Sequence, residues 1–300
     1  MRSTHSGPVG KRISSIGLGC VTFGREIDQA ASFAFADRAQ ERGVTFFDTA
    51  VAYGAGASET ILGAWQAARR PASESIVIAT KLLPPFTPEK INETVAQSLK
   101  RLGLSSIDLL YLHRWDETYE TPESLDALDR LVRDGKVRAL GASNFKADKL
   151  AHSLRRQKAK GFTPFSFVQN NHNLAVSDLT PEFRQICMDH AISIVTYSPL
   201  GAGFLTGKHQ QGVEAGSRFA LVPGHQDVYF HEASYKRLKR LQEVAARTGH
   251  APAHLALAWA LHQPGVTSVL IGGRTPSHLD QAFAAEAFND PALFAELEAT

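Results

Sequence analysis

The chain has 300 residues, of which 43% are hydrophobic, and its formal net charge at pH 7 is +2. This length is long for one domain but typical of an α/β barrel, which runs to about 250 residues or more. A net charge so close to zero argues against nucleic acid or a membrane surface as a partner, and no run of about 18 apolar residues predicts a membrane-spanning helix. We therefore expect one domain over residues 1–300, with neither kind of partner.

The two cysteines, Cys20 and Cys187, lie far apart in the sequence and predict no disulfide framework. The first six residues contain no apolar segment, so we expect no secretory signal. Both features favour a reducing, cytoplasmic setting.

The chain begins with a polar segment, 1–12, that predicts a small hairpin or a loose end, and the apolar run 13–23 predicts a first strand. Gly17 and Gly19 in this run suggest a dinucleotide-binding fingerprint of the Rossmann type. That fingerprint needs a third small residue where Thr22 stands and a helix that begins there, and both are missing. We therefore disfavour a Rossmann domain.

The rest of the chain alternates between apolar runs and amphipathic segments. The apolar runs predict strands over 46–48, 75–81, 107–113, 137–141, 165–170, 191–197 and 267–271. The amphipathic segments predict helices over 28–42, 58–69 with Ser58 as its cap, 88–102, 121–133, 148–160, 179–190, 232–248, 252–262 and 276–287, and a helical tail over 288–300. The glycine-rich segment 201–231 has no clear period and predicts a long loop, which in a compact domain is usually functional or disordered.

This alternation predicts the fold class. Buried strands that are each followed by a helix indicate a parallel sheet. About eight repeats favour closure over an open sheet, so we predict an α/β fold, a (β/α)8 TIM barrel with an N-terminal hairpin and a C-terminal helical tail.

Polar residues gather at the predicted strand ends, which in such a barrel share the face where chemistry takes place. They are Asp48 with Tyr53, Lys81, His113, Ser143 with Asn144, Gln169 with Asn170, and Tyr197 with Ser198. Each has an ordinary interpretation when taken alone: a lysine at a strand end is usually solvated, and a single histidine or tyrosine usually packs. Their joint occurrence on successive strands favours a functional site.

The first four of these residues make chemical sense together. Hydride addition to a carbonyl leaves an alkoxide that needs a proton, and Tyr53 could supply it. Lys81 beside it would lower the pKa of the tyrosine, and Asp48 would keep the lysine charged and oriented. His113 could donate a hydrogen bond to the carbonyl oxygen. A pKa about two units lower requires about 2.7 kcal/mol of differential interaction, which one buried cation could provide.

The motifs around these residues resemble those of the aldo-keto reductases. The resemblance is carried by Asp48-Thr49-Ala50 with Tyr53-Gly54, by Lys81, by the segments 111–116 and 141–145, and by 197–200, in order along nearly the whole chain. It implies a (β/α)8 barrel that uses a nicotinamide cofactor, usually NADP(H), with no metal. Tyr53 would be the general acid/base, tuned by Asp48 and Lys81, and His113 would orient the carbonyl of a small-molecule substrate.

The resemblance also implies a set of cofactor-binding residues. The nicotinamide would meet Ser143, Asn144, Gln169 and Tyr197; the pyrophosphate would meet Ser198, Leu200, Gly201 and Gly203; the adenosine end would meet Gly272, Arg274, Thr275 and Gln281. Gln281 stands where the family often has Glu, and Ala282 where it usually has Asn. Arg274 and Thr275 still offer a cation and a hydroxyl near a helix N-terminus, which favours NADP over NAD.

Three other interpretations remain. The chain could be a nicotinamide-sensing subunit like the potassium-channel β subunits, although the lack of an extended N-terminal segment favours a free-standing enzyme. It could be an isomerase or aldolase in which Lys81 forms a Schiff base. His250 and His254 have a zinc-helix spacing but lack the accompanying Glu, so we expect no metal there. Our prediction is a reductase of aldehydes or ketones, possibly sugar-derived, whose oligomeric state the sequence leaves open.

Overall fold

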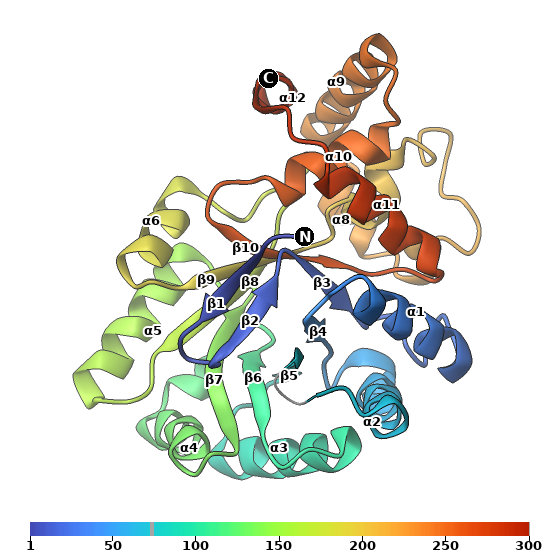
Figure 1. The fold of residues 1–300 in the computed structure, drawn as a ribbon. Helices are drawn as coiled ribbons and strands as arrows, with labels where there is room; N and C mark the ends of the chain where they lie inside the picture. The colour runs from blue at the N-terminus through green and yellow to red at the C-terminus, as the bar shows by residue number, and fades with distance from the viewer. Residues whose placement is uncertain (73–74, 300) are drawn as a thin grey trace.

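The computed structural model describes residues 1–72 and 75–299, and its centre is a closed barrel of parallel strands (Figure 1). The barrel strands are β3 (Ile16–Gly19), β4 (Phe46–Asp48), β5 (Val77–Leu82), β6 (Ile107–Leu112), β7 (Val137–Ser143), β8 (Phe165–Asn171), β9 (Ser193–Tyr197) and β10 (Val266–Ile271). Each strand pairs with the next, and β10 closes the ring by pairing with both β9 and β3. The predicted (β/α)8 barrel is confirmed.

Helices surround the barrel on the outside. They are α1 (Gln29–Glu41), α2 (Ala57–Arg69), α3 (Pro88–Leu102), α4 (Pro122–Arg133), α5 (Ala147–Lys160), α6 (Pro181–Asp189), α9 (Glu232–Thr248), α10 (Pro252–Leu261), α11 (Pro276–Glu286) and the C-terminal α12 (Pro291–Glu298). Helices α3, α4 and α6 begin at Thr-Pro pairs, in which the threonine side chain accepts an early helical N–H. Proline at the first helical position costs no hydrogen bond, because the N–H group that it lacks would have no intrahelical partner there.

The alternation of side chains along each strand decides which residues point into the barrel. On β5, Val77 and Ala79 belong to the cluster inside the barrel, whereas Ile78 and Leu82 belong to the layer between strands and helices. On β4, Phe46 lies inside and Phe47 outside. The period of two therefore directs the next inward positions, Asp48 and Lys81, into the upper end of the barrel.

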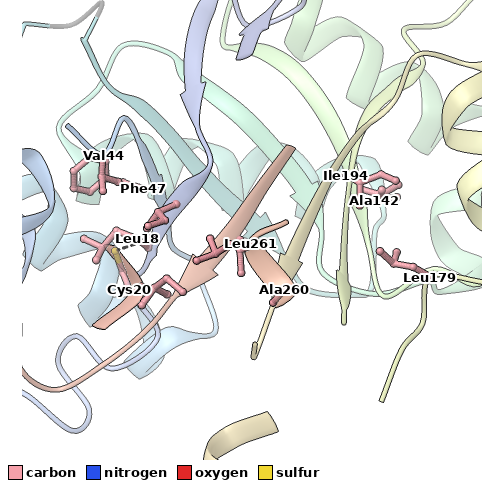
Figure 2. Packing of buried hydrophobic residues seen from close by; sticks show 14 of the residues in the cluster. Leu18, Cys20, Val44, Phe47, Ala142, Leu179, Ile194, Ala260 and Leu261 are labelled. Atoms are coloured by element: carbon pink, nitrogen blue, oxygen red, sulfur yellow. Dashed lines mark hydrogen bonds between the residues drawn. The ribbon is translucent and has the colours of Figure 1, made fainter. Parts of the chain in front are cut away.

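The outer layer forms the larger part of the apolar core. Figure 2 shows part of it, with Leu18 of β3 and Phe47 of β4 in one group and Ile194 of β9 with Ala142 of β7 in another. Because this layer is continuous around the strands, it holds the barrel rigid and leaves the strand ends to carry polar groups.

The predicted first strand is wrong in one respect, because the run 13–23 divides at Ser15. Its first two residues belong to β2 (Lys11–Ser14), which pairs antiparallel with β1 (Ser3–Ser6). Val9 and Ile13 of this hairpin pack against the interior residues of the barrel, so the hairpin covers one opening (Figure 1). Lys11 fixes it there through an ion pair with Asp108, Nζ–Oδ1 2.8 Å.

The predicted long loop over 201–231 is also wrong, because this segment contains the short helices η4 (Gly201–Thr206), α7 (Arg218–Leu221) and α8 (His225–Tyr229). Aromatic residues hold them together: Phe219 packs on Phe230, with ring centroids 4.8 Å apart, and Phe204 stacks on Tyr229 at 6.1 Å. Hydrophobic spacing along the chain is a poor guide to such a segment, since its aromatic residues meet in space and not along one helical face.

A smaller correction concerns Ser58. Helix α2 begins at Ala57 with Gly56 as its cap, so Ser58 does not cap it. The Ser58 hydroxyl instead donates to the Cys20 carbonyl at 2.8 Å and lies 2.8 Å from the Thr49 hydroxyl, tying α2 to the ends of two strands. Among the described residues, no helix has the length and apolar character needed to cross a membrane.

Candidate active site

Lys81 is the centre of the polar group at the barrel mouth. Its Nζ donates to Asp48 Oδ2 at 2.5 Å, to the Thr49 carbonyl at 2.9 Å and to the Tyr53 hydroxyl at 3.2 Å. Lys81 is 0% exposed and Asp48 1%. Burial by itself lowers the pKa of Lys81, but Asp48 and Tyr53 raise it above its usual value, so the lysine stays charged.

The turn that follows β4 positions Tyr53. The residues Gly54, Ala55 and Gly56 have φ values of 56°, 53° and 92°, so the chain reverses sharply before α2. Glycine adopts this left-handed backbone without steric cost, and two of the three positions are glycine. The reversal turns the Tyr53 ring back toward the strand ends, where the Lys81 ammonium lies 4.8 Å from the ring centroid.

The expected lowering of the pKa of Tyr53 is not what the structure shows. Burial raises the pKa of Tyr53 above its usual value, and Lys81 opposes this only in part because Asp48 raises it again. In the protein alone Tyr53 therefore keeps its proton at neutral pH. That is the form a proton donor requires.

His113 follows the end of β6 and lies edge-on to Tyr53, with ring centroids 5.9 Å apart and an interplanar angle of 83°. Burial, Lys81 and Arg114 lower the pKa of His113 to about 3, so its ring is neutral. Its Nδ1 is buried without a hydrogen-bond partner in the described residues, which leaves Nε2 as the nitrogen available to a ligand. A neutral imidazole in this position can donate one hydrogen bond.

The strands β7, β8 and β9 bring a second group of polar residues to the same mouth. Asn144 has φ 57°, and its Nδ2 donates to the His113 carbonyl at 2.9 Å while its Oδ1 accepts from the Tyr197 hydroxyl at 2.7 Å. Ser143 Oγ donates to the Gln169 carbonyl at 2.9 Å. Gln169 uses its own Nε2 to bind Asp48 Oδ1 at 2.8 Å, so it supports the Asp48–Lys81 pair as well as facing the mouth.

A cavity of about 840 Å³ joins these groups to the loops after β9 and β10. The residues that we predicted from the sequence and that line it are Asp48, Tyr53, His113, Ser143, Asn144, Gln169, Tyr197, Ser198, Leu200, Gly203, Gly272, Arg274 and Gln281. Lys81 lies beneath the lining and reaches it through Tyr53. Gly201 and Thr275 lie next to lining residues but are not part of the lining.

The cavity also has lining residues that sequence reasoning missed. They are Glu26, Lys208, Ser217, Arg218, His225 and His278, among others. Most lie in loops or in the segment 201–231, and a search for polar residues at the ends of predicted strands does not find them there. His278 alone had a detectable signal, since it stands three residues after Thr275 at the start of a helix and its ring accepts from the Arg274 and Thr275 N–H groups.

The segment 207–218 is tied to both sides of the cavity mouth. Arg274 donates to the Gly216 carbonyl at 2.8 Å, and Arg218 pairs with Glu26 at 3.0 Å. Lys208 pairs with Glu214 within the segment at 3.0 Å. The cavity thus carries three cations, two of them paired with the lining carboxylates Glu26 and Glu214, and neutral hydrogen-bonding groups at the barrel mouth. This donor set fits a nicotinamide dinucleotide, which combines a neutral amide with anionic phosphates.

Two aromatic residues on loops near the barrel mouth belong to the core and do not line the cavity. Phe23 and Phe145 are fully buried in the outer layer. Their loops turn inward because these rings pack with other aromatic rings, Phe23 with Phe35 and Phe145 with Phe165.

The closed parallel barrel, with polar residues gathered at its mouth, is the architecture of a (β/α)8 enzyme. The pattern of the aldo/keto reductase family matches residues 15–294. The chain therefore belongs to the aldo/keto reductase family, and it is an NAD(P)H-dependent oxidoreductase that acts on carbonyl groups.

Individual relatives agree with this assignment. The chain is 30% identical to an uncharacterized oxidoreductase, YrpG, of Bacillus subtilis, over 93% of this chain and 89% of the relative. It is 31% identical to norsolorinic acid reductase of Aspergillus flavus, over 92% of this chain and 74% of the relative. It is also 28% identical to a probable voltage-gated potassium channel subunit beta of Arabidopsis thaliana, over 94% and 90% respectively.

Proposed function

We propose that the protein is a cytoplasmic, NADP(H)-dependent reductase of small aldehydes or ketones, possibly sugar-derived, with Tyr53 as its general acid/base. The observation that carries this proposal is the contact between the Tyr53 hydroxyl and the buried Lys81 ammonium, 3.2 Å, at the floor of a cavity large enough for a dinucleotide and a small carbonyl compound.

The chemistry of the reduction divides between cofactor and protein. A bound nicotinamide supplies the hydride. The protein has to hold the carbonyl oxygen and deliver a proton to it. Tyr53 and the Nε2 of His113 would donate hydrogen bonds to this oxygen, and Tyr53 would give up its proton.

Lys81 and Asp48 make this proton transfer possible. When Tyr53 loses its proton, the Lys81 ammonium stabilises the tyrosinate. Asp48 holds that ammonium charged and aimed at the tyrosine, and Gln169 holds Asp48. Because Lys81, Asp48 and Gln169 are buried at strand ends, their electrostatic interactions are stronger than they would be in water.

The remaining lining residues suit the cofactor. Ser143, Asn144 and Tyr197 present hydroxyl and amide groups and an aromatic ring where the nicotinamide would lie. Ser198, Leu200 and Gly203 would border the pyrophosphate, with Gly201 supporting them. Gly272 lines the cavity with its backbone, and Arg274 offers a guanidinium to a 2′-phosphate, with Thr275 and Gln281 nearby.

The alternatives can be weighed against the same geometry. A Schiff-base mechanism needs an uncharged lysine amine, whereas Lys81 donates to three oxygens and its pKa is raised. This argues against an aldolase or isomerase. A regulatory subunit is favoured by the relatives named as potassium channel subunits beta. Such a role predicts cofactor binding without appreciable turnover.

The test follows NADPH oxidation optically with a reactive aromatic aldehyde, for the wild type, Tyr53→Phe and the control Tyr235→Phe, which removes a hydroxyl outside the cavity. We expect turnover in the wild type and the control, and a loss of about 100-fold or more in Tyr53→Phe with unchanged NADPH affinity. Equal rates in Tyr53→Phe would refute the general-acid assignment. Binding of NADPH without turnover in the wild type would favour the regulatory alternative.

A further inference from the structure

A second cavity, of about 730 Å³, lies outside the barrel and apart from the strand-end residues. It is lined by residues of α6, α10, β9 and the end of α12. Its walls come from all four elements: Cys187 and Met188, Trp259, Ile194, and Leu297 with Glu298. We call it the outer cavity. Its volume is within the range of small-molecule sites, about 300–1,000 Å³.

The outer cavity contains more positive than negative charge. Arg184 and Arg237 line it and are both half-buried. Neither lies within 4.0 Å of a carboxylate oxygen of residues 1–72 or 75–299. Glu298 is the carboxylate in the lining, and its Oε1 is already held by Trp259 Nε1 at 2.8 Å and Gln263 Nε2 at 3.0 Å.

Arg184 is held in place while part of its guanidinium is left free. Nη1 donates to the Pro264 carbonyl at 2.6 Å, and Nη2 donates to His172 Nε2 at 3.2 Å. Burial and Arg184 itself lower the pKa of His172 to about 4, so the ring is neutral, and its Nε2 also lies 3.3 Å from Gln263 Oε1. A guanidinium has five N–H groups, and the Glu298 carboxylate acts on Arg184 only from beyond 4.0 Å, so part of this guanidinium is left to pair with an anion.

The wall beside this cation is flat and apolar. Trp259 is 4% exposed, and its ring centroid lies 5.0 Å from that of His172. Ile194 and Leu297 extend the apolar surface. A cation next to an aromatic surface complements a molecule with a negative group at one end and a flat apolar body.

We propose that the outer cavity is a binding site for a small aromatic carboxylate, whose carboxylate pairs with Arg184 and whose ring lies against Trp259. The occupant is distinct from the substrate and cofactor of the cavity at the barrel mouth, of about 840 Å³, which we call the inner cavity. The two cavities share a wall, because Asn173 lines the outer cavity and its Nδ2 donates to the carbonyl of Ser198, a residue of the inner cavity, at 2.9 Å.

Calorimetric titration of the full-length protein with 2-naphthoate tests this site. We expect binding in the wild type that weakens about tenfold or more in Arg184→Gln, since a charge-assisted hydrogen bond is lost. The matched control, Arg155→Gln, removes an exposed arginine of the neighbouring helix α5 and should bind like the wild type. Equal affinity in Arg184→Gln, or no binding to the wild type, would overturn the proposal.

Two measurements on the unmodified protein guard against a variant that fails to fold. Neutral 2-naphthamide should bind the wild type about tenfold more weakly than 2-naphthoate, because Arg184 no longer has a charge to pair with. A brominated naphthoate soaked into crystals should place its bromine between α6 and α10. Naphthamide binding as tight as naphthoate, or bromine in the inner cavity alone, would refute the proposed site.

Discussion

Glu59 and Arg101 form an ion pair beneath the turn that carries Tyr53, with Glu59 Oε2 2.6 Å from Arg101 Nε. Glu59 is 0% exposed, and its other oxygen accepts from the Thr80 hydroxyl at 2.6 Å. Thr80 is the outward-facing neighbour of Lys81 on β5. The guanidinium of Arg101 packs against Gly56, where an added Cβ would lie 3.1 Å from it. One buried carboxylate thus ties the tyrosine turn to the lysine strand.

Replacement of Glu59 should reveal this link. Glu59→Ala leaves the Thr80 hydroxyl and Arg101 without their partner, so we expect the free energy of unfolding to fall by about 2–4 kcal/mol, somewhat less than for a fully buried pair because Arg101 is partly exposed. Denaturant unfolding measures this. Glu243→Ala, which removes an exposed carboxylate of α9, should change stability by less than about 0.5 kcal/mol. Similar effects of the two variants would show that the Glu59 pair contributes little.

The Lys81–Asp48 pair permits a double-variant experiment. Lys81→Met should abolish turnover and cost about 3–5 kcal/mol of stability, because it leaves the Asp48 carboxylate buried and unpaired. Adding Asp48→Asn removes that stranded charge, so the double variant should regain part of the stability but none of the turnover. Thermal unfolding and aldehyde reduction measure the two quantities. Recovered activity in the double variant would contradict the role given to Lys81.

The low pKa of His113 makes stability depend on pH. In the unfolded chain this histidine takes up a proton near pH 6.5, whereas in the folded protein its pKa is about 3. The unfolded state therefore binds more protons than the folded state between these pH values. The contribution of the neutral His113 to stability is fully present above pH 6.5 and is lost as the pH falls toward 3.

His113→Gln removes this contribution. The difference in free energy of unfolding between wild type and variant should shrink on acidification below pH 6.5, by up to about 1.4 kcal/mol per pH unit. His172, with a pKa of about 4, contributes in the same direction to both proteins and cancels in the difference. A difference that is constant between pH 7 and 4.5 would show that His113 is not held neutral.

Arg274 tests the choice of cofactor. If its guanidinium binds a 2′-phosphate, Arg274→Gln should weaken NADPH binding by about 10-fold or more and leave NADH binding nearly unchanged. Cofactor titration followed by protein fluorescence measures both affinities. An equal loss for the two cofactors would instead assign Arg274 to holding segment 207–218 through the Gly216 carbonyl.

Much of the fold could be predicted because its signals are local. The β4 and β5 runs show their apolar character in a few residues, and helices such as α3 and α4 begin at Thr-Pro pairs. The errors lie where local signals are weak. The division of the first strand at Ser15 depends on Lys11 reaching Asp108, 97 positions along the chain. The helices within 201–231 depend on an aromatic cluster that forms only when the chain folds back on itself.

The candidate site shows the same contrast between features that local sequence patterns predict and features that depend on contacts between distant segments. Local patterns were enough to place Asp48 and Lys81 at the strand ends, because a period of two directs them to the same side as their apolar predecessors. The contacts that these residues make could be known only from the folded chain. Gln169 reaches Asp48 across 121 positions, and burial by several elements raises the pKa of Tyr53 where one cation was expected to lower it. Desolvation and long-range contacts depend on distances between distant segments, which no pattern along one segment contains.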